Sequence, residues 1–347
     1  KTYEEPKNNQ NNTISMLSNY PKEIAEIIFS SSKDLPNNAQ LSIALIKNGK
    51  TNYYGMIKVN DTLKPAENQN KIFEIGSITK VFTSTVLPSL VVDQKLKLTN
   101  PINTYYPFNF KNNTQITFKS LANHTSGLPR LPENFDLSND INPYQNYGKK
   151  EIEAYLKNLL QLENPPLKIS DYSNLGAGLL GYTLGLSQNT SFQKLLQTKI
   201  FDKYNMTSSF TSAQNLGSQL VKGLDENGKT VSNWDFDVLF GGGGILSTTE
   251  DLTKFANAQF NPNNTELALT RKPTFDVDQQ MKIGLGWHIL KSDNGKDLYW
   301  HNGGTGGYSS SMAINVEQKI AVIILSNVAD INEDVDDLCF ELINKAN

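Results

Sequence analysis

Cysteine is almost absent from this sequence, because Cys339 is the only one among 347 residues. An intramolecular disulfide is therefore excluded, and so are the cysteine-rich zinc sites of small metal-binding domains. Histidine is nearly as scarce, and His124, His288 and His301 are far apart in the sequence. Such scattered histidines do not indicate a histidine-rich metal site.

Long apolar runs and an excess of one charge are also absent. The longest apolar runs are about five to eight residues, well short of the roughly 20 that cross a bilayer as a helix. The 32 basic and 35 acidic residues nearly cancel, which leaves a net charge of -3. This balance gives no reason to expect a nucleic acid or another polyanion as a partner. We therefore predict no transmembrane segment and no nucleic-acid partner.

Several well-known catalytic motifs are missing. The sequence has no G-x-S-x-G elbow, which argues against an α/β-hydrolase. It also has no Walker loop, no H-E-x-x-H and no G-x-G-x-x-G after a strand. With 38% hydrophobic and 19% charged residues, the chain is expected to form a globular protein of one large domain or two subdomains.

Strand patterns occur near both ends of the chain. The apolar run Leu41 to Ile46, followed by the turn Asn48-Gly49 and an aromatic run, predicts a β-hairpin. Ser309 to Ile314 and Ile320 to Ser326 predict a second pair of strands. Because the run IAVIILS is continuously apolar, it is typical of a buried central strand.

Helices are expected on either side of these strands and between them. Apolar spacing predicts a helix over Ile14 to Ser32, interrupted near Pro21, and a closing helix over Val335 to Ala346. The middle third of the chain is mostly helix and loop. The fold class is therefore α+β, with one antiparallel sheet built from both chain ends, flanked by helices, and a mostly helical subdomain inserted.

These patterns also predict the domain organisation. Residues 1–13 are polar and without apolar periodicity, so we expect a disordered lead-in. Residues 14–347 are expected to form a single domain. Within it, 14–75 and 281–347 form the α/β part, and 76–280 form the mostly helical part.

The pattern S-x-x-K occurs three times, about as often as chance predicts. The matches are Ser30/Lys33, Ser77/Lys80 and Ser191/Lys194. Ser77 differs in its context, since an apolar segment ends at Gly76 and an apolar helix follows. Backbone N–H groups are unpaired at a helix N-terminus, which suits a serine that attacks a carbonyl and holds an oxyanion. Lys80, one helical turn later, can act as the base if its pKa is lowered. On the pattern alone, a purely structural Ser77 remains open.

Five blocks of sequence then point to one family. They are GSITK from Gly76, LANHTSGLPR (Leu121 to Arg130), DYSNLGAGLLGY (Asp171 to Tyr182), GGGGILSTTEDLTKF (Gly241 to Phe255) and HNGGTGGYSS (His301 to Ser310). With these blocks in this order, the chain resembles serine β-lactamases and penicillin-recognising peptidases. The resemblance is to the class C β-lactamase and D-alanyl-D-alanine carboxypeptidase branch, and it runs from about Leu41 to Ile343. It implies a β-lactamase/transpeptidase-like fold.

The resemblance implies a role for each matching residue. Ser77 would be the acylated nucleophile, and Lys80 would take or relay its proton. Tyr172 would act with Lys80 as general base and then protonate the leaving group, which requires nearby positive charge to lower or share its proton. Asn174 would hydrogen-bond the substrate's amide oxygen and help to hold Lys80. The backbone N–H groups of Ser77 and Gly304 would form the oxyanion hole.

His301 stands where class C enzymes carry the lysine of a K-T-G triad. It is expected to open an edge strand beside Ser77 and to offer a weaker, pH-dependent positive charge. It could donate a hydrogen bond to a substrate carboxylate or to Tyr172. Asn302, Gly303 and Tyr308 are expected to contact the substrate.

Other conspicuous residues are interpreted as structural. His124 is expected to fix a loop, and Cys339 to be a buried small hydrophobic residue. The run Gly241 to Gly244 is expected to bring backbone close to the site. After it, Ser247 and Glu250 fit a capping box that opens a helix. Trp287 is equally compatible with the pocket wall and with the core.

The resemblance leaves the substrate open between a D-amino-acid peptide, an ester and a β-lactam. Because H-x-G is found in D-alanyl carboxypeptidase and D-aminopeptidase relatives, His301 favours a penicillin-binding D-alanyl carboxypeptidase or D-amino-acid peptidase. A carboxylesterase and a class C-like β-lactamase are alternatives, and so is a penicillin- or peptide-binding protein without turnover. The family's usual setting predicts an extracytoplasmic location in a bacterium, whether periplasmic, secreted or tethered. No metal or organic cofactor is implied, because Ser, Lys and Tyr supply the proton path.

Overall fold

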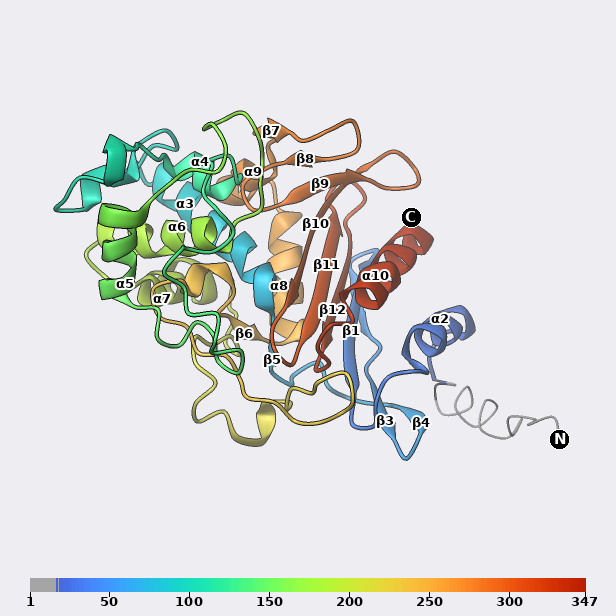
Figure 1. The fold of residues 1–347 in the computed structure, drawn as a ribbon. Coiled ribbons are helices and arrows are strands. Elements are labelled where there is room, and N and C mark those ends of the chain that lie inside the picture. The colour runs from blue at the N-terminus through green and yellow to red at the C-terminus, as the bar shows by residue number, and fades with distance from the viewer. Residues whose placement is uncertain (1–16, 18) are drawn as a thin grey trace.

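One antiparallel sheet of ten strands forms the centre of the protein in the computed structural model, which describes Leu17 and residues 19–347 (Figure 1). The strand order is β4-β3-β1-β12-β11-β10-β9-β8-β7, and β2 pairs with β1. The strands of this sheet are β1 Gln40–Lys47, β2 Lys50–Tyr53, β3 Met56–Val59, β4 Thr62–Pro65, β7 Phe275–Asp276, β8 Lys282–Ile283, β9 His288–Lys291, β10 Asp297–Gly304, β11 Ser309–Asn315 and β12 Ile320–Ser326. A second, two-stranded sheet pairs β5 Phe73–Glu74 with β6 Leu246–Ser247. The predicted lead-in lies outside the described residues.

The main sheet joins the two ends of the chain. Strand β1 pairs with β12 from Leu41 opposite Ser326 to Ile46 opposite Ala321, and β12 pairs in turn with β11. The predicted α+β class, with a sheet assembled from both chain ends, is therefore confirmed. The predicted Asn48-Gly49 turn is confirmed as well, because both residues have positive φ and join β1 to β2.

Strand β12 is apolar along its whole length because both faces of the sheet are covered. Ala321, Ile323 and Leu325 pack into the core shared with the helical half of the molecule. Val322 and Ile324, which point the other way, pack into a second core under two outer helices. Neither face needs polar side chains, so alternation is lost.

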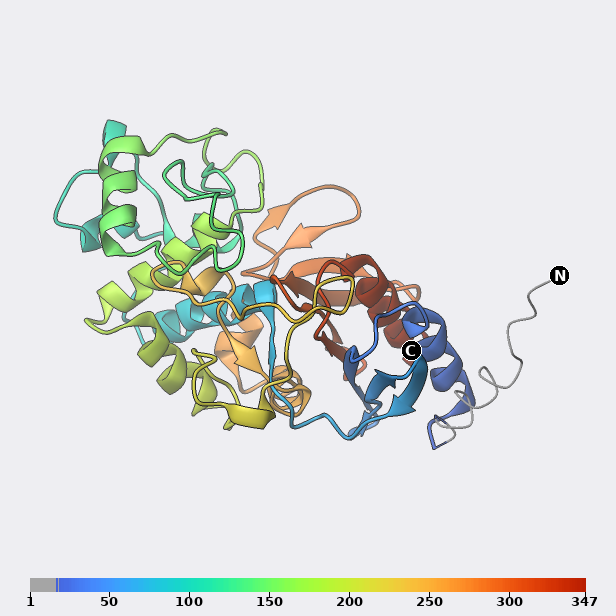
Figure 2. The same cartoon turned by 60° about the horizontal axis from the view of Figure 1, so that its bottom comes forward.

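Those two outer helices are α2 Lys22–Ser32 and α10 Asn332–Ala346, which cover one face of the sheet (Figure 1). The opposite face packs on the helical half, which lies to one side of the sheet in both ribbon views (Figure 2). The α-helices of that half are α3 Thr79–Val92, α4 Phe118–Ala122, α5 Lys149–Ala154, α6 Asn174–Ser187, α7 Phe192–Leu196, α8 Thr249–Gln259 and α9 Thr265–Arg271. Short 3-10 and π-helical turns are η1 Gly76–Ile78, η2 Ile102–Tyr105, η3 Lys111–Asn113, η4 Tyr155–Leu159, η5 Gln197–Phe201, η6 Gly217–Gln219 and η7 Phe240–Gly242.

The predicted helix over Ile14 to Ser32 is described only from Leu17, and its part after Pro21 is confirmed as α2, with Pro21 at the N-cap, where a proline fits the start of a helix. Two other predicted boundaries differ from the structure. The closing helix begins at Asn332, three residues before the predicted start. Helix α8 is capped by Thr248, whose side chain accepts the N–H of Asp251, so the predicted Ser247 capping box is wrong by one residue.

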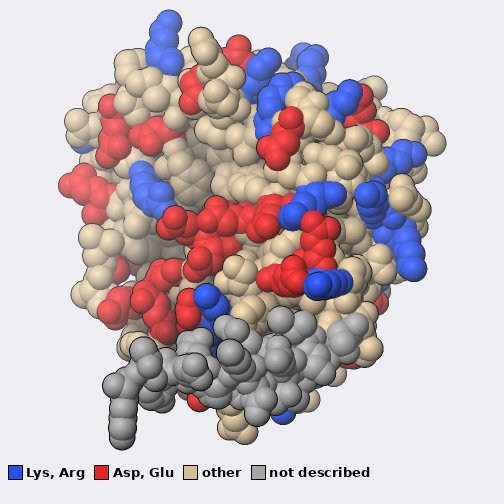
Figure 3. Space-filling view, turned by 90° about the vertical axis from the view of Figure 1, so that its right-hand side faces the viewer, with Lys and Arg blue, Asp and Glu red and all other residues tan. Residues whose placement is uncertain are grey.

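Acidic side chains gather on the face that lies to the right in Figure 1, over α2 and α10 (Figure 3). Glu333 and Asp334 lie in the first turn of α10, where negative charge is stabilised by the helix dipole. At the other end of α10, Lys345 pairs with Glu23 of α2 at 2.7 Å. Within the described part of the chain, no helix has the length and apolar character needed to cross a membrane.

Candidate active site

Ser77 and Lys80 lie on one face of the first turns that follow β5. Ser77 belongs to η1, and Lys80 is the second residue of α3, so the two side chains are one helical turn apart. The side-chain nitrogen of Lys80 donates to Ser77 Oγ at 2.8 Å and to the carbonyl oxygen of Gly242 at 2.7 Å. This is the geometry expected of a serine nucleophile beside its base.

Burial changes the chemistry of Lys80. Its side chain is only 1% exposed. Desolvation, and then the charge of Arg130, lower the pKa of Lys80 well below its usual range. A lysine that loses its proton readily can accept one from a neighbouring hydroxyl.

The other two S-x-x-K pairs lie on the surface. Ser30 is exposed near the end of α2. Ser191 is the N-cap of α7 and accepts the backbone N–H of Lys194 at 3.1 Å. Lys33 and Lys194 are exposed, so only the Ser77/Lys80 pair joins a buried lysine to a serine among the described residues.

The glycine run Gly241 to Gly244 brings backbone to Lys80, as predicted. Thr83 on α3 donates to the carbonyl of Gly241 at 2.7 Å, and Lys80 donates to that of Gly242. The Thr79 hydroxyl accepts the N–H of Ile245 at 3.1 Å. Three polar contacts from one face of α3 therefore fix this turn against the site.

Glycines allow β10 to approach the serine turn at backbone distance. A Cβ at Gly303 would lie 2.2 Å from the Ile75 carbonyl oxygen and 2.6 Å from the Ser77 nitrogen. A Cβ at Gly76, whose φ is +56°, would lie 2.5 Å from the Gly304 nitrogen. Because neither glycine has a side chain, β10 can lie directly against the serine turn. Ser77 and Gly304 therefore line the same wall of the cavity.

Tyr172 precedes the N-cap of α6. Ser173 fixes this position, because its hydroxyl accepts the Gly176 N–H at 2.8 Å and donates to the Pro129 carbonyl at 2.6 Å. The Tyr172 ring has Lys80 Nζ 4.6 Å and Arg130 Cζ 5.2 Å from its centroid. The side chains of two basic residues, the guanidinium of Arg130 and the amine of Lys80, therefore lie near one phenol ring.

The expected lowering of the Tyr172 pKa is not what the structure gives. Burial raises the pKa above the usual value for tyrosine, and this effect exceeds the lowering by hydrogen bonding to Ser77 and by the charge of Arg130. Tyr172 is therefore a neutral phenol in the resting site, able to donate a proton. The base is better sought in Lys80.

Asn174 lines the same cavity as Ser77, but it does not hold Lys80 in the way expected. The hydrogen bonds that Lys80 makes to other described residues go to Ser77 and Gly242. The Asn174 side chain instead reaches the phenol of Tyr144 and lowers the pKa of that group against the effect of its burial.

His301 lies within β10 rather than at its start. The strand begins at Asp297 and pairs with β9 as far as Trp300, and from His301 onward it pairs only with β11. The edge strand that was predicted to begin at His301 is therefore the second half of β10, and this half faces Ser77.

His301 does not supply the expected positive charge. The imidazole is 1% exposed, and its Nδ1 lies 2.7 Å from the carbonyl oxygen of Asn302. Desolvation, followed by the nearby His288 and Lys80, lowers its pKa well below the usual value. Its Nε2 has no hydrogen-bond partner among the described residues. The His301 imidazole is thus neutral at physiological pH.

All three histidines of the chain surround Tyr172. Ring centroids lie 4.9 Å from Tyr172 for His124, 6.5 Å for His288 and 6.1 Å for His301. Burial lowers the pKa of His124 to about 3 and that of His288 to about 4. His124 has φ +61° and accepts the Ser173 N–H on Nδ1, which agrees with the predicted loop-fixing role.

Of the three expected substrate contacts, two lie on the cavity. Gly303 and Asn302 line it, and the Asn302 side chain donates to Asp336 of α10 at 2.8 Å. Tyr308 does not line the cavity, because its ring is 1% exposed and its hydroxyl donates to the Val221 carbonyl at 2.5 Å. Trp287 is fully buried as well and belongs to the core. Cys339 is buried as predicted.

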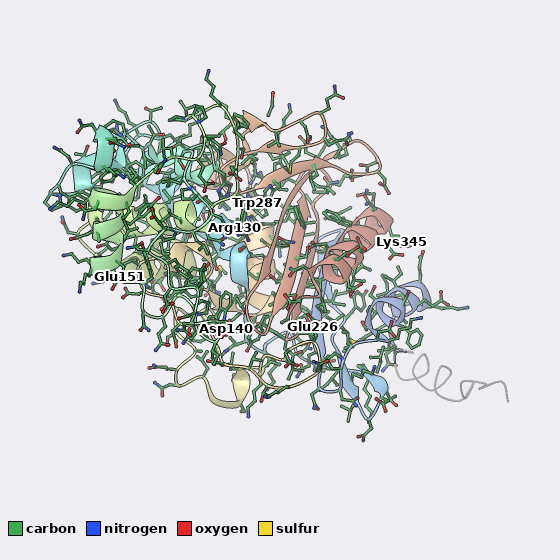
Figure 4. All side chains as sticks on the ribbon, viewed as in Figure 1. Arg130, Asp140, Glu151, Glu226, Trp287 and Lys345 are labelled. Atoms are coloured by element: carbon green, nitrogen blue, oxygen red, sulfur yellow. The ribbon has the colours of Figure 1, made fainter. Side chains whose placement is uncertain are left out.

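The cavity has a volume of about 630 Å³, which is ample for a small acyl compound or a short peptide. Sequence reasoning did not assign most of its walls. The unassigned lining residues are Arg130, Tyr144, Trp234, Phe236, His288, Trp300, Thr305, Gly306, Ala329, Asp330 and Asn332. Arg130, which lies where the sheet meets the helical half (Figure 4), could have been noticed as one of only two arginines and as the last residue of a family block. Among the described residues, no group of acidic, cysteine and histidine side chains is arranged to hold a metal ion.

Glu74, which lies near the cavity loop, is a further residue to which the sequence analysis assigned no role. It is buried in β5, three residues before Ser77, and one carboxylate oxygen accepts from Asn233 at 2.5 Å and from the Trp234 N–H at 3.2 Å. These bonds hold the loop that brings Trp234 to the cavity. Burial raises the pKa of Glu74 from 4.5 to about 7.

This shift predicts a pH-dependent stability. Between about pH 4.5 and 7 the folded Glu74 keeps its proton while the unfolded one loses it, so stability falls as pH rises through this range. Urea titrations from pH 5 to 8 should show wild type losing up to about 3 kcal/mol relative to Glu74→Gln. Exposed Glu250→Gln is the control and should follow wild type. Equal pH slopes for wild type and Glu74→Gln would contradict the prediction.

Comparison with known proteins gives a consistent family match. A family model described as Beta-lactamase matches residues 36–339. A β-lactamase of Pseudomonas fluorescens is 29% identical over 261 residues, covering 72% of this chain and 69% of that protein. Protein flp of Staphylococcus aureus (strain N315) is 26% identical over 309 residues, covering 83% of this chain and 59% of the relative. β-Lactamase-like protein 4 of Dictyostelium discoideum is 28% identical over 321 residues, covering 81% of this chain and 55% of that protein. The chain thus spans little more than half of the last two relatives.

Solved structures share the fold at lower identity. A β-lactamase/D-alanine carboxypeptidase from Pseudomonas syringae superposes with a TM-score of 0.78 at 21% identity, covering 94% of this chain and 99% of the other. A class C β-lactamase superposes with a TM-score of 0.77 at 19% identity, covering 92% of this chain and 96% of the other. At these identities the likeness shows a common fold.

Proposed function

Because the chain belongs to the Beta-lactamase family and is a hydrolase of the serine β-lactamase-related group, we propose that it works through an acyl-enzyme formed at Ser77. The observation that carries the proposal is the 2.8 Å hydrogen bond between Lys80 Nζ and Ser77 Oγ, made by a lysine that is almost fully buried. Burial favours the neutral amine, which can take the hydroxyl proton as the serine attacks.

The proposed reaction uses groups already placed around Ser77. Neutral Lys80 takes the proton of Ser77 Oγ while this oxygen bonds to the substrate's carbonyl carbon, and the carbonyl oxygen gains negative charge. The N–H groups of Ser77 and Gly304 would bind that oxygen. The bond to the leaving group then breaks, and the leaving group takes a proton from Tyr172, which regains one from Lys80. Water attacks the ester by the same path in reverse and releases the acid.

For the substrate we propose a D-alanyl or other D-amino-acid peptide, so that the protein is a penicillin-binding carboxypeptidase or peptidase. Support comes from the H-x-G sequence at His301, where class C β-lactamases carry lysine, and from the burial that keeps this histidine neutral. One protein of the same fold is a β-lactamase/D-alanine carboxypeptidase. An esterase, a β-lactamase and a binding protein without turnover are the alternatives that the experiment must separate.

Incubation with a fluorescent penicillin, followed by denaturing electrophoresis over time, distinguishes these functions. We expect one label per chain, located at Ser77 by peptide mapping and lost slowly, because a peptidase deacylates a penicillin poorly. Rapid loss of label with destruction of the antibiotic would mean a β-lactamase. Hydrolysis of nitrophenyl esters without any label would mean an esterase. Permanent label together with no turnover of a D-alanyl-D-alanine peptide would mean a binding protein.

A further inference from the structure

We propose that Arg130 anchors an anionic group of the substrate, so that the site selects small acyl compounds that carry a carboxylate. This inference rests on the proposed function, since it concerns the cavity in which Ser77 lies. It adds the chemical class of the substrate and a residue that selects it.

Arg130 is positioned by the backbone around it. Its carbonyl oxygen accepts the N–H of Leu175 at 3.0 Å, which fixes the loop to the first turn of α6 beside Asn174. The side chain lines the cavity together with Ser77, and the residue is exposed to solvent. Its guanidinium carbon lies 5.2 Å from the centroid of the Tyr172 ring. A guanidinium over an aromatic ring keeps its N–H donors free to form a fork with a carboxylate.

The charge of Arg130 has no acidic partner in the described part of the chain. No carboxylate there lies within ion-pair distance of its guanidinium. The other arginine, Arg271, donates a hydrogen bond to the side chain of Gln259. A fixed charge that faces a cavity without a partner is available to a ligand of opposite sign.

The other basic groups near Ser77 cannot take this role. Lys80 is buried and already donates to Ser77 and Gly242. His288 and His301 are neutral at physiological pH, since burial lowers both of their pKa values. Among the residues that line the cavity, Arg130 therefore supplies the permanent positive charge.

The remaining walls orient a substrate of this kind. Asp330 is the acidic residue that lines the cavity, and it follows β12 on the sheet side. Its negative charge repels an anionic group there, so the substrate's carboxylate is favoured on the helical side, where Arg130 lies. Beside the Arg130 loop, Tyr144 stacks on Phe236 at 4.7 Å and packs on Trp234 at 5.6 Å between ring centroids. These aromatic rings provide an apolar surface for the carbon chain between the reacting carbonyl and the carboxylate.

Two matched p-nitrophenyl esters test the proposal, one of glutarate, which leaves a free carboxylate, and one of valerate, which is neutral. We expect wild type to have the higher kcat/KM on the glutarate ester, with the difference mainly in KM. Arg130→Gln should reduce the ratio of the two kcat/KM values about 10-fold, as expected for the loss of a charged hydrogen bond. Arg130→Lys should retain part of the preference. Exposed Lys50→Gln removes the same charge from the β1–β2 hairpin and should behave as wild type.

The outcomes separate this inference from the proposed function. An unchanged ratio in Arg130→Gln overturns the anchor, and so does an equal fall for both esters, which would mean that Arg130 acts only through Tyr172. If wild type hydrolyses neither ester, binding is measured in Ser77→Ala by tryptophan fluorescence with glutarate and glutaramide. A preference for glutarate that disappears in Ser77→Ala/Arg130→Gln would sustain the anchor even if the penicillin assay refutes the proposed function. Equal binding of the two compounds in Ser77→Ala would overturn the anchor itself.

Discussion

Replacing Ser77 by alanine should abolish both labelling by penicillin and hydrolysis of every ester or peptide that the protein accepts. The hydroxyl is the atom proposed to bond to the carbonyl carbon, and alanine leaves no nucleophile at that point. A loss of at least about 10⁴-fold in kcat/KM is expected, because the remaining donors cannot form the covalent intermediate. Assays with the fluorescent penicillin and with nitrophenyl esters measure the two losses separately.

The chain contains its own controls for this experiment. Ser30→Ala and Ser191→Ala remove the serines of the other two S-x-x-K pairs, both of which are exposed. Both variants should keep wild-type rates, although Ser191→Ala removes an N-cap and should lower the free energy of unfolding by about 1 kcal/mol. Substantial turnover by a clean Ser77→Ala preparation would disprove the proposed mechanism.

Replacing Lys80 by methionine should slow acylation about 10³-fold, within the usual range for the loss of a general base. Methionine fills a similar volume but cannot accept the serine proton. Because Lys80 is almost fully buried, its removal also ends the cost of taking an amine out of water. We therefore expect the variant to be at least as stable as wild type, so that activity and stability change in opposite directions. Stopped-flow labelling and urea unfolding measure the two quantities.

Lys33→Met and Lys194→Met provide matched controls, since both lysines are exposed and belong to the other S-x-x-K pairs. Neither change should alter the acylation rate. If Lys80→Met lost stability together with activity, Lys80 would be mainly a structural residue. If it kept the wild-type acylation rate, another group would have to be the base.

Much of the architecture could be predicted from local patterns. The continuous apolar run at Ile320 to Ser326 requires cover on both faces, and β12 lies at the centre of the sheet with a core on each side. The Asn48-Gly49 pair requires positive φ, and a hairpin turn is found there. Boundaries were less predictable, as the start of α10 shows, because polar residues at a helix end have no periodicity to mark them.

The candidate site was predictable where one element or one motif determines it. Ser77 and Lys80 are one turn apart at the start of a helix, so their spacing allows the contact that the structure shows. The position of Tyr172 beside Lys80 required a long-range match to the blocks of a family, since 92 positions separate the two residues in the sequence. Tyr308 shows the limit of such matching, because its block lies on the site while its own ring is buried behind it.

The sequence by itself determined which residues could react and in what order they follow one another. Only the tertiary structure decided their charge states and their access to the cavity. The neutrality of His301, the lowered pKa of Lys80 and the raised pKa of Tyr172 all arise mainly from desolvation. The free charge of Arg130 arises from the lack of an acid near it among the described residues. Desolvation and pairing depend on every group packed around a side chain, and those groups come from distant parts of the chain.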